Sequence, residues 1–365
     1  MLENKYEILF NLRYNFIYYI TAFITLIFVV EFYLKNRTYT KIQYYFLAIL
    51  LLVITFFFGT RGEYVGTDTV NNIKYFTGRV VISDLSSLND IGLFSLSMFL
   101  AKFSDNINFF LTAAAFIYLA PILLAIHNLQ LRNPLIFFFC LLSMFYFKGM
   151  GINIQKQGIA FSFFICGISY LFNNKKIIGY SLFAVAFIFH ASIIIPITVF
   201  FLSFEVKKIN WVFVVYIITT LLSLINFNLN SILSNIPIVN ILTESRLDTY
   251  YIDKGNYKIG FRPEFWLFNT IFTMIGYITL KNIDKFNSVF LSKNYKVFFV
   301  AYVLLSSFFF LMFSARFSDR FGLMSWVFIP LLLLPYTQIR YNLKYLNTLT
   351  IFLISVFLFI AFKFI

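Results

Sequence analysis

Six basic side chains border apolar stretches of this chain outside its lysine-rich short loops. They are Arg61, Lys156, Arg246, Arg262, Arg316 and Arg320. Arginine offers a planar fork of N–H donors that matches phosphate oxygens, and lysine offers a compact positive charge. The six side chains therefore predict a site for an anion at one face of the protein.

Arg61 lies in a glycine-rich stretch, residues 59–68, that ends in Asp68. Glycine lets the backbone turn sharply and approach a ligand closely. Arg61 suits phosphate oxygens, and the Asp68 carboxylate is able to accept a proton from a hydroxyl group. The alternative is a plain turn whose arginine and aspartate are solvated at the membrane surface.

Lys156 and Gln157 stand at the beginning of another apolar stretch, in the first turn or two of the helix expected there. The backbone N–H groups and the dipole of a helix start favour an anion, whereas a lysine that merely extends to the membrane surface is the alternative.

His190 lies deep in an apolar context and is the second candidate proton acceptor. Ionisable groups at membrane depth usually face a cavity, although a lone histidine is also often a satisfied core residue.

The second half of the chain supplies the remaining candidates. Arg262 precedes Pro263, a residue type that favours the first turn of a helix. Arg316 and Arg320 are four residues apart and share one helix face, with Asp319 as their nearby acid. Their excess positive charge indicates an anionic ligand, and Arg246 is a supporting candidate.

The sequence contains no zinc-spaced His/Cys set, P-loop, dinucleotide fingerprint or hydrolase serine elbow. An Asp-x-Asp carboxylate pair, which metal-dependent glycosyltransferases usually show, is also absent from the segments predicted to lie outside. We therefore predict chemistry without a metal or cofactor. Cys140 and Cys166 lie inside apolar runs and are expected to be small packing residues.

The composition is that of an integral membrane protein. The chain is 61% hydrophobic and 12% charged, with a mean hydropathy of +0.84. Its long apolar stretches lack the alternation of barrel strands, so helices are expected to cross the bilayer. The net charge of +14 is then explained largely by membrane topology and does not predict a nucleic-acid partner.

Apolar length and charged ends predict about ten full transmembrane helices. They are 14–34, 42–58, 107–126, 134–147, 157–172, 211–225, 264–280, 297–313, 321–337 and 345–362. The stretch 91–103 is too short to cross and is expected to be a re-entrant or interfacial helix. The stretch 177–202 is bracketed by lysine pairs, so we predict a helical hairpin that enters from the cytoplasm and turns near His190.

With these choices, Lys and Arg concentrate in short loops on the cytoplasmic side, where Glu205 and Asp284 are the only acids. These loops are 35–41, 127–133, 173–176, 203–210, 281–296 and 338–344. The chain is then one transmembrane domain, residues 1–365, with two long external loops at 59–106 and 226–263. The candidate site residues fall on the external side.

Four clusters, in their order along the chain, resemble the EpsG-like branch of bacterial O-antigen polymerases, the Wzy-type enzymes. The matching residues are Arg61 with Gly66-Thr67-Asp68, Asn153-x-Gln155-Lys156-Gln157, Phe189-His190-Ala-Ser, and Gly260-Phe-Arg262-Pro263-Glu264, within about residues 55–325. Many relatives carry arginine where this chain has Lys156. Lysine lacks the bidentate fork, which weakens the case for a pyrophosphate clamp at that position.

The resemblance implies a metal-independent membrane glycosyltransferase of the bacterial inner membrane, with its active site facing the periplasm. It would transfer a growing glycan from undecaprenyl pyrophosphate to the terminal sugar of another lipid-linked oligosaccharide unit. A chain-length regulator protein and membrane lipid are the other implied partners, and a GT-C-like architecture is expected by analogy. Asp68, His190 and Arg61 would be catalytic, whereas Lys156, Gln157, Arg246, Arg262, Arg316 and Arg320 would bind pyrophosphate.

Three alternatives remain open. An O-antigen ligase would share the external arginines and the histidine, so the sequence barely separates it from a polymerase. A flippase or transporter of lipid-linked sugars would need a basic cavity reachable from both faces, whereas the candidates pool at one. A non-enzymatic scaffold would leave Arg316 and Arg320 without a role.

Overall fold

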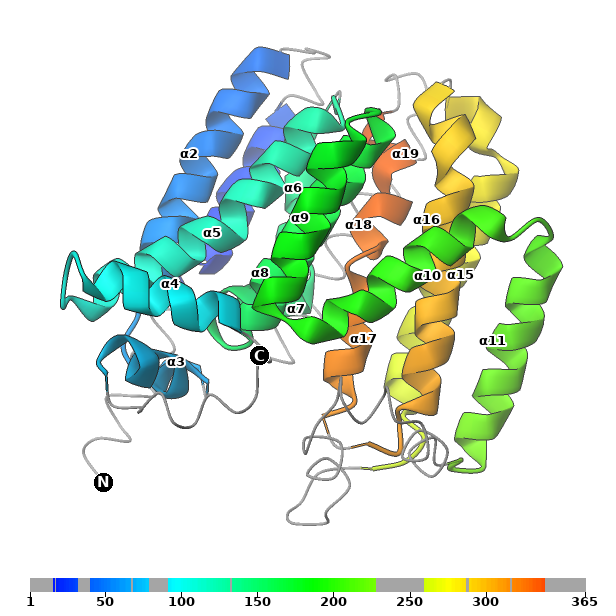
Figure 1. The fold of residues 1–365 in the computed structure, drawn as a ribbon. Coiled ribbons are helices and arrows are strands. Elements are labelled where there is room, and N and C mark those ends of the chain that lie inside the picture. Colours follow the sequence, from blue (N-terminus) through cyan, green and yellow to red (C-terminus); the bar gives the residue numbers. More distant parts are fainter. Residues whose placement is uncertain are drawn as a thin grey trace. The chain divides into compact units, whose positions relative to one another are not determined.

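The computed structural model describes residues 16, 18–31, 40–66, 68–78, 91–131, 133–227, 259–286, 289–315 and 317–338. Within these ranges every regular element is a helix, as predicted (Figure 1). Contacts divide the chain into two compact units, unit 1 (1–191 with 336–365) and unit 2 (192–335). That the two units form a single transmembrane domain stays a prediction.

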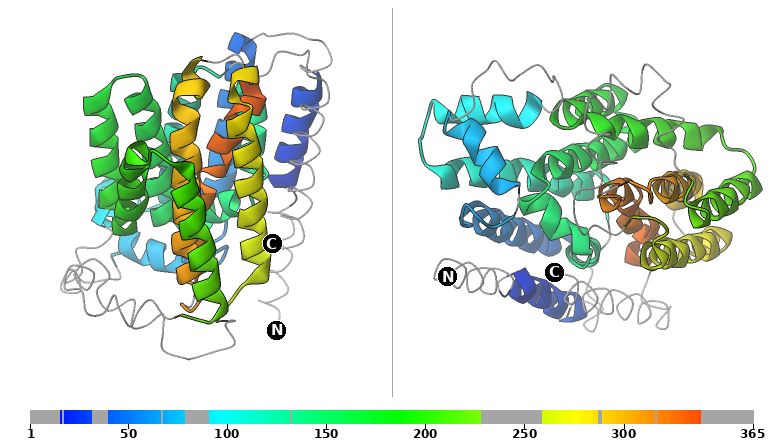
Figure 2. Two further views of the ribbon diagram at one scale, coloured as in Figure 1. Left: turned by 90° about the vertical axis from the view of Figure 1, so that its right-hand side faces the viewer. Right: turned by 90° about the horizontal axis from the view of Figure 1, so that it is seen from below.

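Unit 1 is a bundle in which neighbouring helices pack in sequence. Its described helices are Tyr18–Glu31, α2 (Thr40–Gly59), α3 (Thr69–Phe76), α4 (Ile91–Ala101), α5 (Ile107–Asn128), α6 (Pro134–Leu142), α7 (Phe145–Ile152), α8 (Gln155–Phe172) and α9 (Lys176–Phe189). α2 packs on α5, α5 on α8, and α8 on α9 (Figure 1). The short helix α4 runs across the direction of α2 and α9, in agreement with a segment too short to cross a bilayer (Figures 1 and 2).

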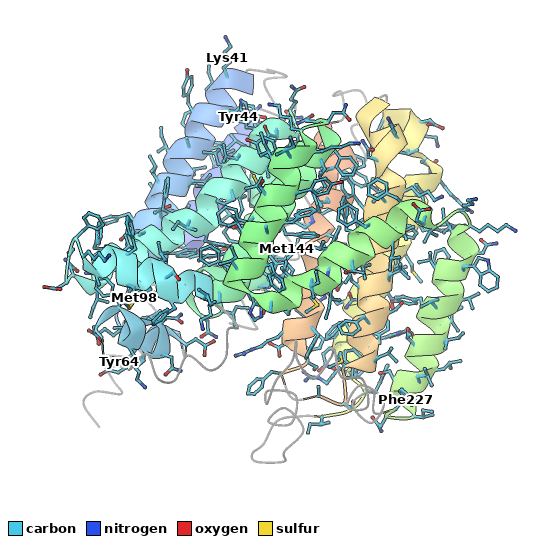
Figure 3. The ribbon with its side chains drawn as sticks, in the orientation of Figure 1. Lys41, Tyr44, Tyr64, Met98, Met144 and Phe227 are labelled. Carbon is cyan, nitrogen blue, oxygen red and sulfur yellow. The ribbon has the colours of Figure 1, made fainter. Side chains whose placement is uncertain are left out.

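The two ends of unit 1 differ in character. At one end, the Tyr44 hydroxyl donates to the carbonyl of Ile126 (3.2 Å), and the Asn173 side chain donates to the carbonyl of Asn128 (2.6 Å). These bonds join the start of α2, the end of α5 and the turn between α8 and α9. Figure 3 shows Lys41 and Tyr44 at this end, and Tyr64 and Met98 at the opposite end.

Unit 2 is organised around α16. Its helices are α10 (Ile194–Glu205), α11 (Ile209–Leu224), α15 (Pro263–Lys281), η3 (Ile283–Phe286), α16 (Val289–Leu311), α17 (Asp319–Trp326) and α18 (Ile329–Leu332), with η2 (Ala191–Ile193) and α19 (Leu334–Gln338) at its boundaries. α10, α11, α15 and α17 all pack on α16, and α11, α15 and α16 run alongside one another (Figure 2). The α16 residues 297–303 are almost entirely buried, so this helix is the core of the unit.

One buried asparagine links three helices of unit 2. The Asn269 side-chain oxygen accepts from Ser306 (2.9 Å) and Tyr302 (3.2 Å) of α16 and from Ser325 (3.3 Å) of α17. Its side-chain nitrogen donates to the carbonyl of Phe265 (2.8 Å), so both the oxygen and the nitrogen of the amide are hydrogen-bonded. Because the site excludes water, these bonds hold α15, α16 and α17 in one register.

Three described helices are long and apolar enough to cross a membrane, namely Lys41–Gly59 in α2, Ile107–Asn128 in α5 and Lys293–Leu311 in α16. A fourth crossing is possible if the bent pair α6 and α7 forms one span. The other described apolar helices have fewer than 18 residues or begin with polar turns. A helical membrane protein is therefore supported, whereas a total of about ten spans stays a prediction. The span predicted at 345–362 lies outside the described residues.

Two predicted spans are interrupted instead of continuous. The stretch 134–147 bends by 77° between α6 and α7, where the Ser143 hydroxyl donates back to the Phe139 carbonyl (2.7 Å). Such back-bonding competes with the helical ladder and favours a bend. The stretch 321–337 splits into α17, α18 and α19, and prolines at 330 and 335 explain why it is not one helix.

The helix break predicted near His190 is present. α9 ends at Phe189, His190 adopts an extended conformation, and α10 begins at Ile194 after one short 3-10 turn. Neither arm is long enough to cross a bilayer alone. That the two arms form a hairpin returning to the same membrane face stays a prediction, because they belong to different units.

Large apolar side chains cover much of the outer surface of these helices. Examples are Phe56 on α2 (67% exposed), Phe116 on α5 (53%), Ile217 on α11 (57%) and Met274 on α15 (61%). Water would penalise this much exposed apolar area on a soluble protein, whereas lipid does not. These surfaces are therefore lipid-facing.

The Asn269 network yields a prediction about stability. Asn269→Leu should lower the free energy of unfolding by about 2 kcal/mol, taking roughly 0.6 kcal/mol for each of its interhelical bonds. Ser307→Ala is the matched control, because the Ser307 hydroxyl bonds only within α16, to the Val303 carbonyl (2.9 Å). Thermal unfolding in detergent should show a clear loss for the first variant and little change for the second. If Asn269→Leu unfolded at the same temperature as Ser307→Ala, the network would not stabilise unit 2.

Candidate functional site

Two of the motifs singled out from the sequence are docked together in unit 1. The loop 61–68 and the start of α3 lie against residues 151–155, between the end of α7 and the start of α8. Four side-chain hydrogen bonds join the two segments. They run from Arg61 to the Ile152 carbonyl (3.3 Å), from Thr69 to the same carbonyl (3.0 Å), from the Asp68 backbone N–H to the Asn153 side chain (3.0 Å), and from Asn72 to Gln155 (3.2 Å).

Arg61 is buried, with 2% of its surface exposed. One guanidinium nitrogen, Nη1, donates to the Phe58 carbonyl (2.5 Å), and the other, Nη2, donates to the Ile152 carbonyl (3.3 Å). Phe58 is in the last turn of α2 and Ile152 is the last residue of α7, so both carbonyls are at helix ends that lack intrahelical partners. Arg61 therefore positions the loop. That Arg61 also contacts a pyrophosphate stays a prediction.

Gly66 allows the loop to approach α7 closely. Its φ is +92°, a conformation that favours glycine, and a Cβ at this position would lie 3.1 Å from the Ile152 carbonyl oxygen. The close approach brings Thr69 and Asp68 to the end of α7. Asp68 stands directly before α3 and is partly exposed, while its backbone is fixed by Asn153.

Lys156 and Gln157 lie in the first turn of α8, as expected. Gln157 is buried, whereas Lys156 is partly exposed. Gly158 lets this helix start against α7, because a Cβ there would collide with the Met150 carbonyl. Asp68 and Lys156 thus come from two segments that hydrogen bonds hold together.

His190 lies in the same unit and is partly exposed, at the end of α9. The preceding residue, Phe189, stacks on Phe163 of α8 with ring centroids 5.9 Å apart and lies against Gly92 of α4. Phe163 is seven residues beyond Lys156, which corresponds to about 10 Å along an α-helix. The histidine therefore belongs to the same end of unit 1 as Asp68 and Lys156.

In unit 2, Arg262 is the residue directly before α15, and its side chain makes no capping hydrogen bond to the helix backbone. Its Nε donates to Glu264 (2.6 Å), and its guanidinium lies 4.7 Å from the ring centre of Phe265. Phe265 packs on Trp326 of α17, with centroids 5.4 Å apart. The preceding loop is fixed as well, because the Phe261 N–H donates to the Asn226 side chain (3.2 Å). The arginine therefore has a defined orientation.

Arg320 lies in the first turn of α17, with its guanidinium 5.2 Å from the ring centre of Phe317. The end of α16 joins the loop before α15 through a bond from the Gly260 N–H to the Phe313 carbonyl (3.0 Å). Arg262 and Arg320 are therefore at the same end of unit 2. Arg246 and Arg316 lie outside the described residues, so their predicted roles stay predictions.

The sequence interpretation missed the side chains that do the positioning. Asn72, Asn226 and Asn269 had no assigned role, although each is a polar residue close to or inside an apolar stretch. Lys148 of α7 was also missed and is 95% buried, with 5% of its surface exposed. A polar side chain inside an apolar span must be hydrogen-bonded, and this rule was the available signal for Asn269, whereas Asn72 and Asn226 lie in predicted external loops and gave no such signal.

Within the described ranges, no group of three His, Cys, Asp or Glu side chains could hold a metal ion. The charged groups that the described residues offer are arginine, lysine and histidine side chains and two partly exposed carboxylates, Asp68 in unit 1 and Asp319 in unit 2. Fold and site together define a helical membrane protein with a polar, cationic end in each unit. The chain matches the model of the EpsG family over residues 44–365, and it belongs to that family. No curated protein and no solved structure matches it.

The buried position of Arg61 leads to a testable expectation. Arg61→Lys keeps the charge but lacks the two separate guanidinium nitrogens that reach the two carbonyls, so it should lower the free energy of unfolding by about 2–4 kcal/mol. Lys156→Gln, at a partly exposed position of the same site, should leave stability nearly unchanged. Both are measured by thermal unfolding without any substrate. A wild-type midpoint for Arg61→Lys would mean that Arg61 does not hold the loop.

Proposed function

We propose that this protein polymerises lipid-linked oligosaccharide repeat units at the periplasmic face of the bacterial inner membrane. The product would be O-antigen or a related surface polysaccharide. The proposal rests on membership of the EpsG family together with one structural observation. The Arg61–Asp68 loop and the Asn153–Gln157 segment, two of the four clusters that resemble the family, are held together by side-chain hydrogen bonds.

The proposed reaction is a glycosyl transfer without a metal. A hydroxyl oxygen on the terminal sugar of one lipid-linked unit attacks the anomeric carbon of the growing glycan. The bond from that carbon to the pyrophosphate oxygen breaks, and undecaprenyl pyrophosphate leaves with the electron pair. The hydroxyl proton passes to a protein carboxylate or imidazole. Negative charge develops on the leaving group as the carbon becomes oxocarbenium-like, so preorganised cations stabilise the transition state.

The roles follow from the chemistry of each side chain. Asp68 is the first candidate proton acceptor, because it is partly exposed on a loop whose backbone is fixed. His190 is the second candidate. Arg262, Arg316 and Arg320 are proposed to hold the pyrophosphate, with Lys156, Gln157 and Arg246 in support. Glu264 and Phe265 would hold the Arg262 guanidinium in one orientation before substrate binds.

The proposal is tested by deleting the gene and separating lipopolysaccharide on a gel. Loss of a polymerase should leave core carrying a single repeat unit. Loss of a ligase would leave bare core while lipid-linked glycan accumulates. Loss of a flippase would leave bare core with lipid-linked single units retained in the cytoplasmic leaflet. A deletion strain in which the lipopolysaccharide ladder, the capsule and the exopolysaccharide are all unchanged would overturn the proposal.

Complementation of the deletion strain tests the assigned residues. Asp68→Asn and Arg320→Ala should abolish long chains at normal expression, since loss of one stabilising group costs about a hundred- to thousandfold in rate. The matched controls are Glu63→Gln and Lys74→Ala. Glu63 is an exposed residue with the charge of Asp68, and Lys74 is an exposed residue with the charge of Arg320. If Asp68→Asn keeps a full ladder while His190→Gln loses it, the histidine is the proton acceptor. Full ladders from both primary variants would exclude Asp68 and Arg320 from the mechanism.

A further inference from the structure

Six lysines gather at the end of unit 2 that is opposite Arg262 and Arg320. This lysine cluster consists of Lys207, Lys208, Lys281, Lys285, Lys293 and Lys296. It comes from three segments, namely the turn before α11, the end of α15 with η3, and the first described turns of α16. The Lys296 ammonium donates to the Lys207 carbonyl (3.0 Å), which joins the first and third segments directly.

The second segment is joined to the first through aromatic contacts. Phe213 of α11 lies edge-on to Tyr277 of α15, with ring centroids 5.0 Å apart. The Lys281 ammonium lies 4.6 Å from the centre of the same Tyr277 ring. η3 also packs on α16, so all three segments meet at one end of the unit.

The charge at this end is poorly balanced. Within the described residues of these segments the acids are Glu205 and Asp284, against six lysines. All the lysines except Lys296 are exposed. The positive-inside preference explains why lysines occur in turns on one side of the membrane, and the bond from Lys296 to the Lys207 carbonyl brings two of these turns into direct contact. Converging like charges repel, and an anion placed among them relieves the repulsion.

The helices that carry the lysines also carry exposed apolar side chains a few residues away along the chain. Leu202 and Phe204 of α10 are 54% and 49% exposed, Trp211 of α11 is 67% exposed, and Ile278 of α15 is 59% exposed. Each is within nine residues of a cluster lysine on its own helix or the adjoining turn. A soluble phosphate would use only the charges, whereas a phospholipid would also cover this apolar surface with its acyl chains.

We propose that the lysine cluster binds an anionic phospholipid, with the headgroup phosphate among the ammonium groups and the acyl chains along α10, α11 and α15. The bound lipid neutralises the converging charges and fixes the three turns relative to one another. It stabilises unit 2 by mass action, because it binds the folded arrangement and not the unfolded chain. This site is separate from the proposed polymerase site and does not depend on that function.

The test uses the purified full chain in detergent. Phosphatidylglycerol and phosphatidylcholine with identical acyl chains are added separately, and binding is measured by native mass spectrometry and by the thermal midpoint. Phosphatidylglycerol should bind at least about tenfold more tightly, a difference of roughly 1.4 kcal/mol, and should raise the midpoint. Glycerol phosphate at the same concentration should do neither, since it lacks acyl chains.

Variants locate the site. A quadruple glutamine variant should lose the preference for phosphatidylglycerol; it carries Lys207→Gln, Lys208→Gln, Lys281→Gln and Lys293→Gln. A quadruple variant with arginine at the same four positions should keep the preference. The matched control is Lys175→Gln with Lys176→Gln, a second exposed lysine pair that precedes a helix, which should bind as the wild type does.

Three results would overturn the proposal. They are equal binding of the two lipids by the wild type, an undiminished preference in the glutamine variant, and stabilisation by glycerol phosphate equal to that by phosphatidylglycerol. The arginine variant shows whether a loss reflects charge or misfolding. The polysaccharide ladder of the glutamine variant reports separately on the polymerase activity.

Discussion

A buried guanidinium placed between two helix ends holds the candidate site of unit 1 together. Helix ends leave carbonyl groups without intrahelical partners and carry partial negative charge. Phe58 and Ile152 are buried in the protein, so their carbonyls depend on a protein donor instead of bulk water. Arg61 donates to Phe58 at the end of α2 and to Ile152 at the end of α7. Its planar fork serves both carbonyls with one side chain, which explains an arginine at a position that is almost fully buried.

Each unit separates its charges between its two ends. In unit 1 the lysines at 41, 175 and 176 lie at the end where α2 starts and α9 starts, whereas Asp68 and Lys156 lie at the other. In unit 2 the lysine cluster lies opposite Arg262 and Arg320. Lysine is a strongly hydrated point charge suited to turns in water, while arginine tolerates partial burial. In unit 2 the choice of cation therefore follows the environment at each end, whereas in unit 1 the end that holds Arg61 also carries Lys156 and the buried Lys148.

Apolar length and charge predicted the helical class, most helix positions, the short helix at 91–101 and the break at His190 correctly. These features depend on local sequence, because hydrophobic runs and their polar ends are visible in one stretch of chain. The interruptions at Ser143 and around Pro330 were missed, since an apolar run looks the same whether or not its helix bends. The docking of Asp68 beside Asn153 was not predictable either. The sequence suggested that both segments face the same side, but a hydrogen bond between residues 85 positions apart depends on tertiary packing.

The two units anchor their functional loops with the same device. Asn153 follows the end of α7, and its side-chain oxygen accepts the backbone N–H of Asp68. Asn226 follows the end of α11, and its side-chain oxygen accepts the backbone N–H of Phe261, next to Arg262. An asparagine beyond a helix end tolerates the tight backbone found there and still presents a carbonyl to a neighbouring loop. These two anchoring bonds use backbone N–H groups and do not involve the Asp68 carboxylate or the Arg262 guanidinium. The candidate loop of each unit therefore gains part of its fixed geometry from one asparagine side chain that binds its backbone.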